Sequence, residues 1–95
     1  MSKYRKSARG QDCLVRIEGI CNFNPETVVL GHLNGAGMGI KASEIHGAFC
    51  CSSCHDELDG RTNFRKLEYA TKRLMHYEGI KRTQEYWIKN GILKI

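Results

Sequence analysis

The chain has 95 residues, which allows one small domain and excludes a two-domain enzyme. Hydrophobic residues make up 41% and charged residues 26%, an ordinary balance for a globular domain that argues against wholesale disorder. The net charge of +5 is uneven, with +4 over residues 1–10, −5 over 11–60 and +6 over 61–95. Basic flanks around an acidic centre favour a polyanionic partner, although solvated helix faces would give the same pattern.

The five cysteines indicate that a disulfide or metal staple supplements a core that is marginal at this length. The basic, polar start of the chain is not followed by an apolar segment that could act as a signal peptide. No apolar run approaches the roughly 20 residues that span a bilayer. We therefore expect a cytoplasmic protein without a membrane segment, in which clustered cysteines bind metal rather than each other.

The first part of the chain is expected to contain little regular structure. Residues 1–10 should form a flexible basic arm, and residues 11–95 should form the single domain. From Cys13 to Cys21 apolar and polar residues alternate enough to predict a short extended piece that turns at Gly19.

A β-hairpin is predicted next. The asparagines and Pro25 within residues 22–26 indicate a turn. The β-branched and apolar residues 27–33 predict a strand with His32 near its end. A glycine-rich loop over residues 34–39 follows, and a second extended piece runs into residues 48–51.

Helices are predicted for the rest of the chain. Ser52 or Ser53 can cap a helix that carries His55 and that Gly60 ends or bends. Helical spacing of apolar residues from Phe64 to Tyr77 predicts a second helix that Gly79 breaks, followed by a short helix over roughly residues 81–90. No interleaving of aromatic and basic residues that would form a base-stacking platform stands out, and four aromatic residues are assigned to the core: Tyr69, Tyr77, Tyr86 and Trp87.

The cysteine spacing predicts a structural zinc site. Cys51 and Cys54 form a C-x2-C knuckle, in which a tight turn aims two thiolates at one zinc ion about 2.3 Å away. Cys13 and Cys21 supply a second pair, and four thiolates close a tetrahedral site. Cys50 could replace Cys51 in a wider pair, but the knuckle geometry favours Cys51. The alternative is that the cysteines are buried or spare.

A closed zinc site leaves His32 and His55 without a structural role. Because His55 directly follows a zinc ligand in the first turn of a helix, its side chain should point sideways toward the hairpin, near His32. Two imidazoles in that arrangement can hold a divalent cation and a scissile phosphate, one as metal ligand and one as general base. Each histidine alone is more often an ordinary core or surface residue, and His46 and His76 are placed in that class.

The motifs occur in a specific order: a cysteine pair, a strand ending in Gly31-His32, a loop, and Cys51-x-x-Cys54-His55 at a helix start. This order resembles the HNH, or His-Me finger, nucleases with a ββα-metal core. More closely, Cys13-Leu-Val-Arg-Ile-Glu-Gly-Ile-Cys21 with Asn24-Pro25-Glu26-Thr27, and Cys51-Ser-Ser-Cys54-His55-Asp56-Glu57-Leu58-Asp59, resemble the YbcO-type family of small phage and prophage nucleases. The resemblance runs from about Lys6 to the region of Trp87.

The resemblance implies a small α+β fold, a zinc-stapled ββα-metal (HNH-like) finger with a helical C-terminal tail. It also implies a structural zinc on the four cysteines Cys13, Cys21, Cys51 and Cys54. It makes His32 the general base that activates water and His55 a ligand of a catalytic Mg²⁺ or other divalent ion.

Gly31 departs from the HNH pattern. Many HNH nucleases carry, immediately before the base, an aspartate that is a second ligand of the catalytic metal, and glycine has no ligating side chain. Another residue could replace that ligand, and the candidates are Asp56, Asp59, Glu44 and Asn34. Otherwise His55, water and substrate phosphate hold the ion without a second side chain.

Three functions compete. The first is a metal-dependent endonuclease of phage or prophage origin that cleaves nucleic-acid phosphodiesters, with DNA the expected partner and substrate. The second is a non-catalytic, zinc-stapled nucleic-acid-binding module in which both histidines are packing residues. The third is a structural or partner-binding phage protein. The basic flanks serve the first two equally, the paired histidines favour the first, and Gly31 favours the second.

Overall fold

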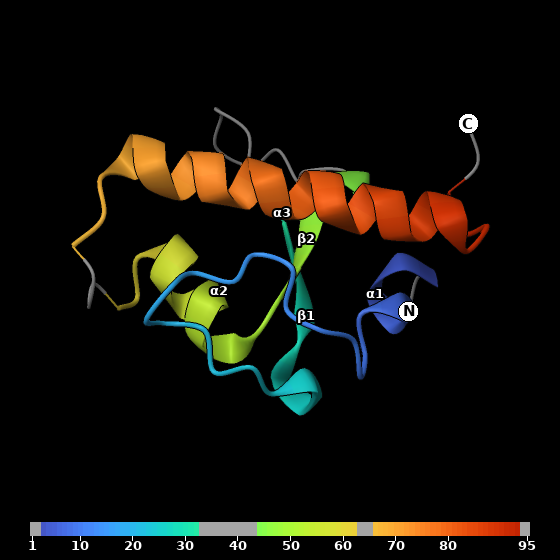
Figure 1. Ribbon diagram of the computed structural model, residues 1–95, viewed down its shortest axis with the longest axis horizontal. Helices are drawn as coiled ribbons and strands as arrows, with labels where there is room; N and C mark the ends of the chain where they lie inside the picture. Colours follow the sequence, from blue (N-terminus) through green and yellow to red (C-terminus); the bar gives the residue numbers. More distant parts are fainter. Residues whose placement is uncertain (1–2, 33–43, 63–65, 94–95) are drawn as a thin grey trace.

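The structure, a computed structural model, describes residues 3–32, 44–62 and 66–93 (Figure 1). A long helix lies across the two-stranded sheet, and the two shorter α-helices lie to the left and right of the strands in this view (Figure 1). The elements in chain order are α1 (Lys3–Ser7), η1 (Pro25–Thr27), β1 (Val29–His32), η2 (Glu44–His46), β2 (Gly47–Cys50), α2 (Ser52–Asp59) and α3 (Tyr69–Lys89). The predicted small α+β architecture with a helical C-terminal part is therefore present.

The two strands form the predicted hairpin. They pair antiparallel, with Val29 opposite Cys50 and His32 opposite Gly47. β2 is buried along its whole length, because α3 covers the sheet and the Thr83 hydroxyl accepts a hydrogen bond from the Phe49 N–H at 3.0 Å. This pairing places His32 at the C-terminal end of β1, opposite the first residue of β2.

Helix α2 begins at the cysteine knuckle. Its N-cap is Cys51, whose sulfur accepts a hydrogen bond from the Cys54 N–H at 3.4 Å. The prediction that Ser52 or Ser53 caps the helix is wrong, because both serines already lie inside its first turn. The predicted end is confirmed: Gly60 takes a left-handed conformation, with φ of +80°, that favours glycine.

Helix α3 is one helix of 21 residues rather than two. The predicted break at Gly79 is wrong, and the reason is close packing. A Cβ atom on Gly79 would lie 2.7 Å from Val15 Cγ2 and 3.2 Å from Ala48 Cβ. The missing side chain lets the helix approach both the N-terminal loop and β2. A glycine inside a helix costs about 1 kcal/mol of helix stability, and the close packing offsets that cost at this position. The helix ends at Asn90-Gly91, as predicted.

Helix α1 packs against the core, whereas the sequence predicts a flexible arm over residues 1–10. Trp87 is fully buried, its ring lies 4.7 Å from that of Tyr4, and its Nε1–H donates to Ser7 Oγ at 2.8 Å. Ala8 is also buried. Because an indole N–H needs a partner when it is buried, Trp87 ties α1 to α3.

The stretch from Cys13 to Cys21 forms a loop instead of the predicted extended piece. Arg16 adopts a positive φ of +51°, and the N–H groups of Ile20 and Cys21 both donate to the Ile17 carbonyl, at 3.0 and 2.9 Å. These turns curl the loop back on itself, so that its two cysteines can lie on the same side.

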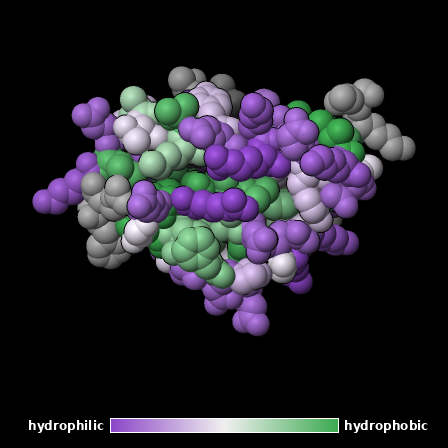
Figure 2. All heavy atoms as spheres, viewed as in Figure 1, coloured by the Kyte–Doolittle hydropathy of each residue, from purple (hydrophilic) through white to green (hydrophobic). Residues whose placement is uncertain are grey.

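The assignment of four aromatic residues to the core is half right. Tyr86 packs edge-on against Phe49, and Trp87 is buried. Tyr69 and Tyr77, in contrast, are 74% and 52% exposed on α3. In this view hydrophilic side chains cover most of the surface, and apolar atoms show between them near the middle (Figure 2).

Two expectations fall on parts of the chain that the structure does not describe. The glycine-rich loop over residues 34–39 and Phe64, the predicted start of the long helix, lie outside the described residues. Among the described helices, none is long and apolar enough to cross a membrane.

Candidate functional site

Four cysteine side chains converge between the N-terminal loop and the start of α2. Cys13, Cys21, Cys51 and Cys54 place their sulfur atoms within 4.8 Å of one another. The Cys21 and Cys51 sulfurs are 3.8 Å apart, and two ligands of a tetrahedral zinc with 2.3 Å bonds would be separated by about 3.8 Å. The cluster therefore fits a metal ion such as zinc. Cys50 stands outside it, with its sulfur 3.9 Å from the Val29 carbonyl oxygen.

The electrostatics of the cluster also suit a cation. A hydrogen bond from the Cys54 thiol, with support from the Arg16 N–H, lowers the pKa of Cys13 to about 4. The same bond raises the pKa of Cys54, and burial raises the pKa of Cys21 to about 11. Without a cation the cluster thus favours one thiolate stabilised by neighbouring thiols. A bound dication would neutralise additional thiolates and favour their deprotonation.

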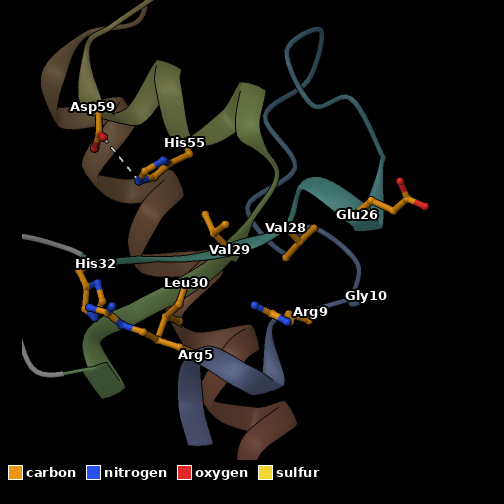
Figure 3. Close-up of a pocket in the computed structure, with 10 residues that line it drawn as sticks. All are labelled: Arg5, Arg9, Gly10, Glu26, Val28, Val29, Leu30, His32, His55 and Asp59. Carbon is orange, nitrogen blue, oxygen red and sulfur yellow. Dashed lines mark ion pairs between the residues drawn. The ribbon is translucent and has the colours of Figure 1, made fainter. Parts of the chain in front are cut away.

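A depression of about 1000 Å³ opens beside the hairpin (Figure 3). α1 and the residues after it, the turn before β1, β1 itself and α2 all contribute to its wall. Ten residues line it: Arg5, Arg9, Gly10, Glu26, Val28, Val29, Leu30, His32, His55 and Asp59.

Both histidines singled out in the sequence line this depression, on different sides of it (Figure 3). His32 stands at the end of β1, and the Arg5 side chain points toward it (Figure 3). His55 stands in the first turn of α2, with its Nε2 atom 3.5 Å from Asp59 Oδ2 one turn later. The two rings do not face each other as expected, because Gly31 rather than His32 lies against His55.

The position of Gly31 explains why no acidic residue precedes His32. A Cβ atom on Gly31 would lie 3.2 Å from His55 Cδ2 and 2.6 Å from Cys50 Sγ. The side-chain position therefore faces His55, as a second metal ligand would, but the Cys50 sulfur already fills the space.

Of the candidates for the missing ligand whose side chains the structure describes, Asp59 lines the depression. Asp56 does not contribute to its wall and pairs instead with Arg61 at 3.4 Å. Glu44 is the first residue of η2, and Asn34 lies outside the described residues. His55 and Asp59 share a face of α2, since residues four apart are neighbours on a helix.

His76 contacts β1 but is not among the residues that line the depression. The sequence predicts an ordinary core or surface histidine, and the structure shows a buried ring whose Nε2 lies 2.8 Å from the Gly31 carbonyl oxygen. Burial lowers the pKa of His76, which favours the neutral imidazole. A sequence signal was present, because His76 shares helical spacing with three buried residues of α3: Ile80, Thr83 and Trp87.

The basic residues Arg5 and Arg9 were not predicted to belong to a site. They line the depression because α1 packs against α3 through the contacts of Trp87. The one local signal is the four-residue spacing of Tyr4 and Ala8, which gives a short helix one apolar face.

Comparisons with known proteins identify the family. The family described as "Putative nuclease YbcO" matches residues 2–92. Two relatives, from Escherichia coli (strain K12) and from Enterobacteria phage 82, carry the same description, and each is 45% identical over 97 residues, with 99% of both chains covered. A solved structure described as "Structure of a putative bacteriophage protein from Escherichia coli str. K-12 substr. MG1655" is 43% identical, with a TM-score of 0.80, and the match covers 94% of this chain and 100% of that one. The chain therefore belongs to the family described as "Putative nuclease YbcO".

Proposed function

We propose that the chain is a metal-dependent endonuclease of the HNH, or ββα-metal, type that hydrolyses DNA phosphodiesters in the cytoplasm. The observation that carries the proposal is the shared depression. His32 from the hairpin and His55 from the following helix line it, and the four-cysteine cluster lies at the start of that helix. Membership of a family described as a nuclease supports a nucleic-acid substrate.

The two groups of metal-ligating residues have separate tasks in this proposal. The four cysteines hold a structural zinc that joins the N-terminal loop to α2, since a site closed by four thiolates leaves no position for substrate. His55 and Asp59 are the residues that would hold Mg²⁺ or another divalent ion at the depression. Such an ion, when bound, polarises a phosphoryl oxygen and stabilises the charge that develops on it.

His32 is the proposed general base. Its ring accepts a proton from a water molecule as the water oxygen forms the new bond to phosphorus and the leaving oxygen departs. General-base catalysis of this kind contributes about 10²–10⁴-fold to the rate. His32 suits the task because it stands at the end of β1 on the wall of the depression and outside the cysteine cluster.

Arg5 and Arg9 supply positive charge on the same wall. Guanidinium groups bind phosphate oxygens with two parallel hydrogen bonds, which fixes the orientation of the phosphate. Arg5 points toward His32 (Figure 3), so a phosphate held by Arg5 would lie within reach of the base. α1 thus has a role in substrate binding in this proposal.

The test is a plasmid-nicking assay with zinc-loaded protein. Mg²⁺, Mn²⁺, Ni²⁺ or Zn²⁺ is added in turn, and a reaction without added metal is the control. We expect nicking that depends on the added ion, and we expect His55→Ala and Asp59→Asn to weaken that dependence while the zinc content stays unchanged. Protein that is zinc-loaded and bound to DNA but leaves the plasmid uncut with every ion would instead support the non-catalytic binding module.

A further inference from the structure

One face of α3 carries alternating aromatic and basic side chains, although the sequence did not predict such an interleaving. Tyr69, Arg73, Tyr77 and Lys81 are spaced four residues apart, so they form one stripe along the helix surface. We call these four residues the tyrosine stripe. Both of its tyrosines are more than half exposed, and Lys81 is exposed as well.

Arg73 organises the stripe. Its guanidinium carbon lies 5.6 Å from the centroid of the Tyr69 ring and 5.6 Å from that of the Tyr77 ring, within the range of a cation–π interaction. Its Nη2 atom also donates to Tyr77 Oη at 3.4 Å. The two rings therefore share one cation that lies between them.

The stability of α3 does not account for these rings. Pairs at this spacing on an exposed helix contribute only about 0.2–0.5 kcal/mol each, and the helix is anchored by the buried residues on its other face. Leu74 on the same part of the helix is 59% exposed, so this stretch of α3 presents three large apolar side chains to solvent. A patch of this kind on a basic helix indicates a binding surface.

We propose that the tyrosine stripe binds the unpaired bases of a single-stranded DNA segment. An exposed tyrosine offers a π face on which any base can stack, and interleaved basic groups contact the neighbouring phosphates. Bases in a duplex are already stacked on one another, so the stripe would distinguish a single strand from a duplex. The charge supports this occupant, because residues 61–95 carry nine basic and three acidic side chains.

The tyrosine stripe lies on the same helix as a residue that contacts β1. Tyr77 directly follows His76, and the His76 ring contacts the Gly31 carbonyl next to His32. This inference rests on the proposed function for its ligand class, and it adds that the substrate contains a single-stranded segment.

The test measures the affinity of zinc-loaded protein for a fluorescent oligothymidylate and for a fluorescent duplex of the same length. Binding is monitored by fluorescence anisotropy, without added divalent ion. We expect the double variant Tyr69→Ala/Tyr77→Ala to bind the single strand at least about 5-fold more weakly, since base stacking on one ring has roughly that effect. Its duplex affinity should change less than about 2-fold. The double variant Tyr69→Phe/Tyr77→Phe keeps the ring faces and should bind the single strand like the wild type.

Lys89→Gln is the matched control, because it removes an exposed positive charge from the far end of α3 and should weaken both complexes equally. An equal loss of single-strand and duplex binding in the tyrosine-to-alanine variant, or no loss of either, would overturn the inference. Tyrosine-dependent binding by a wild-type protein that cuts no substrate would refute the nuclease and leave the stripe as a single-strand binding site. If Tyr69→Ala/Tyr77→Ala cleaves DNA and binds the single strand like the wild type, the single-strand site on the stripe is refuted and the proposed nuclease is not.

Discussion

Gly31→Ala tests how the hairpin is packed against the proposed catalytic residues. The added Cβ atom would lie 2.6 Å from Cys50 Sγ, closer than real Cβ contacts come, and 3.2 Å from His55 Cδ2. Cys50 is fully buried in β2, so its sulfur has no free space into which to move. Overpacking of this kind costs about 1–3 kcal/mol of the free energy of unfolding.

The size of the effect makes it measurable. One kcal/mol shifts the melting temperature of a domain of this length by about 4–8 °C, so Gly31→Ala should melt at least about 4 °C below the wild type. Cys50→Ala alone removes one buried sulfur and should cost about 1 kcal/mol. In the double variant Gly31→Ala/Cys50→Ala the sulfur that clashes with the new Cβ atom is absent. Its loss in free energy of unfolding should therefore be about 1–2 kcal/mol smaller than the sum of the two single losses.

The assay is thermal and urea unfolding of the four zinc-loaded proteins, with the zinc content of each measured beforehand. Additive losses of stability in the double variant would refute the steric explanation for Gly31. A further arm is Gly31→Asp, which restores the acidic residue of the HNH pattern. This variant should lower stability rather than improve divalent-ion binding, because the Cβ atom of the aspartate would clash with Cys50 Sγ in the same way.

The other predictions concern the cysteines, the buried histidine and the N-terminal helix. Cys54→Ser should lose the bound zinc and unfold the chain, because binding of a structural zinc contributes on the order of 10 kcal/mol to folding. Cys50→Ala, in contrast, should keep one zinc per chain, as measured by elemental analysis. The pKa of His76 is lowered by burial, so below about pH 6.5 the unfolded chain takes up a proton that the folded chain resists. Wild-type stability should therefore fall more steeply than that of His76→Gln as the pH is lowered from 7 to 5 in urea unfolding, and parallel curves would contradict this. Arg5→Ala should weaken DNA binding and cleavage, measured by anisotropy and nicking, whereas Lys3→Ala, on the same helix but not on the wall of the depression, should change both little.

The sequence predicts the site where neighbouring residues determine the geometry. The C-x2-C spacing of Cys51 and Cys54 indicates a knuckle, and the structure places both sulfurs with those of Cys13 and Cys21. Gly60 ends α2 because a left-handed residue there satisfies the last carbonyl groups of the helix. These features depend on interactions between residues that are close in sequence, and such interactions can be predicted from a single sequence.

Features that depend on distant packing were missed. The sequence predicts a helix break at Gly79, but the role of this glycine is set by Val15 and Ala48, which are far from it along the chain. The packing of α1 depends on a hydrogen bond between Trp87 and Ser7, which are 80 residues apart. No local pattern near Ser7 or Trp87 indicates that the two residues are partners. The sequence therefore does not predict that Arg5, on α1, lies at the site.

The most direct measurement of the central claim is the rate of DNA cleavage by zinc-loaded wild type and by zinc-loaded His32→Ala, with the same divalent ion and saturating DNA. If His32 is the general base, the variant should keep its zinc, its melting temperature and its DNA affinity but cleave at least about 10²-fold more slowly. Equal rates in the two proteins, at equal zinc content, would contradict the assignment of His32 as the base.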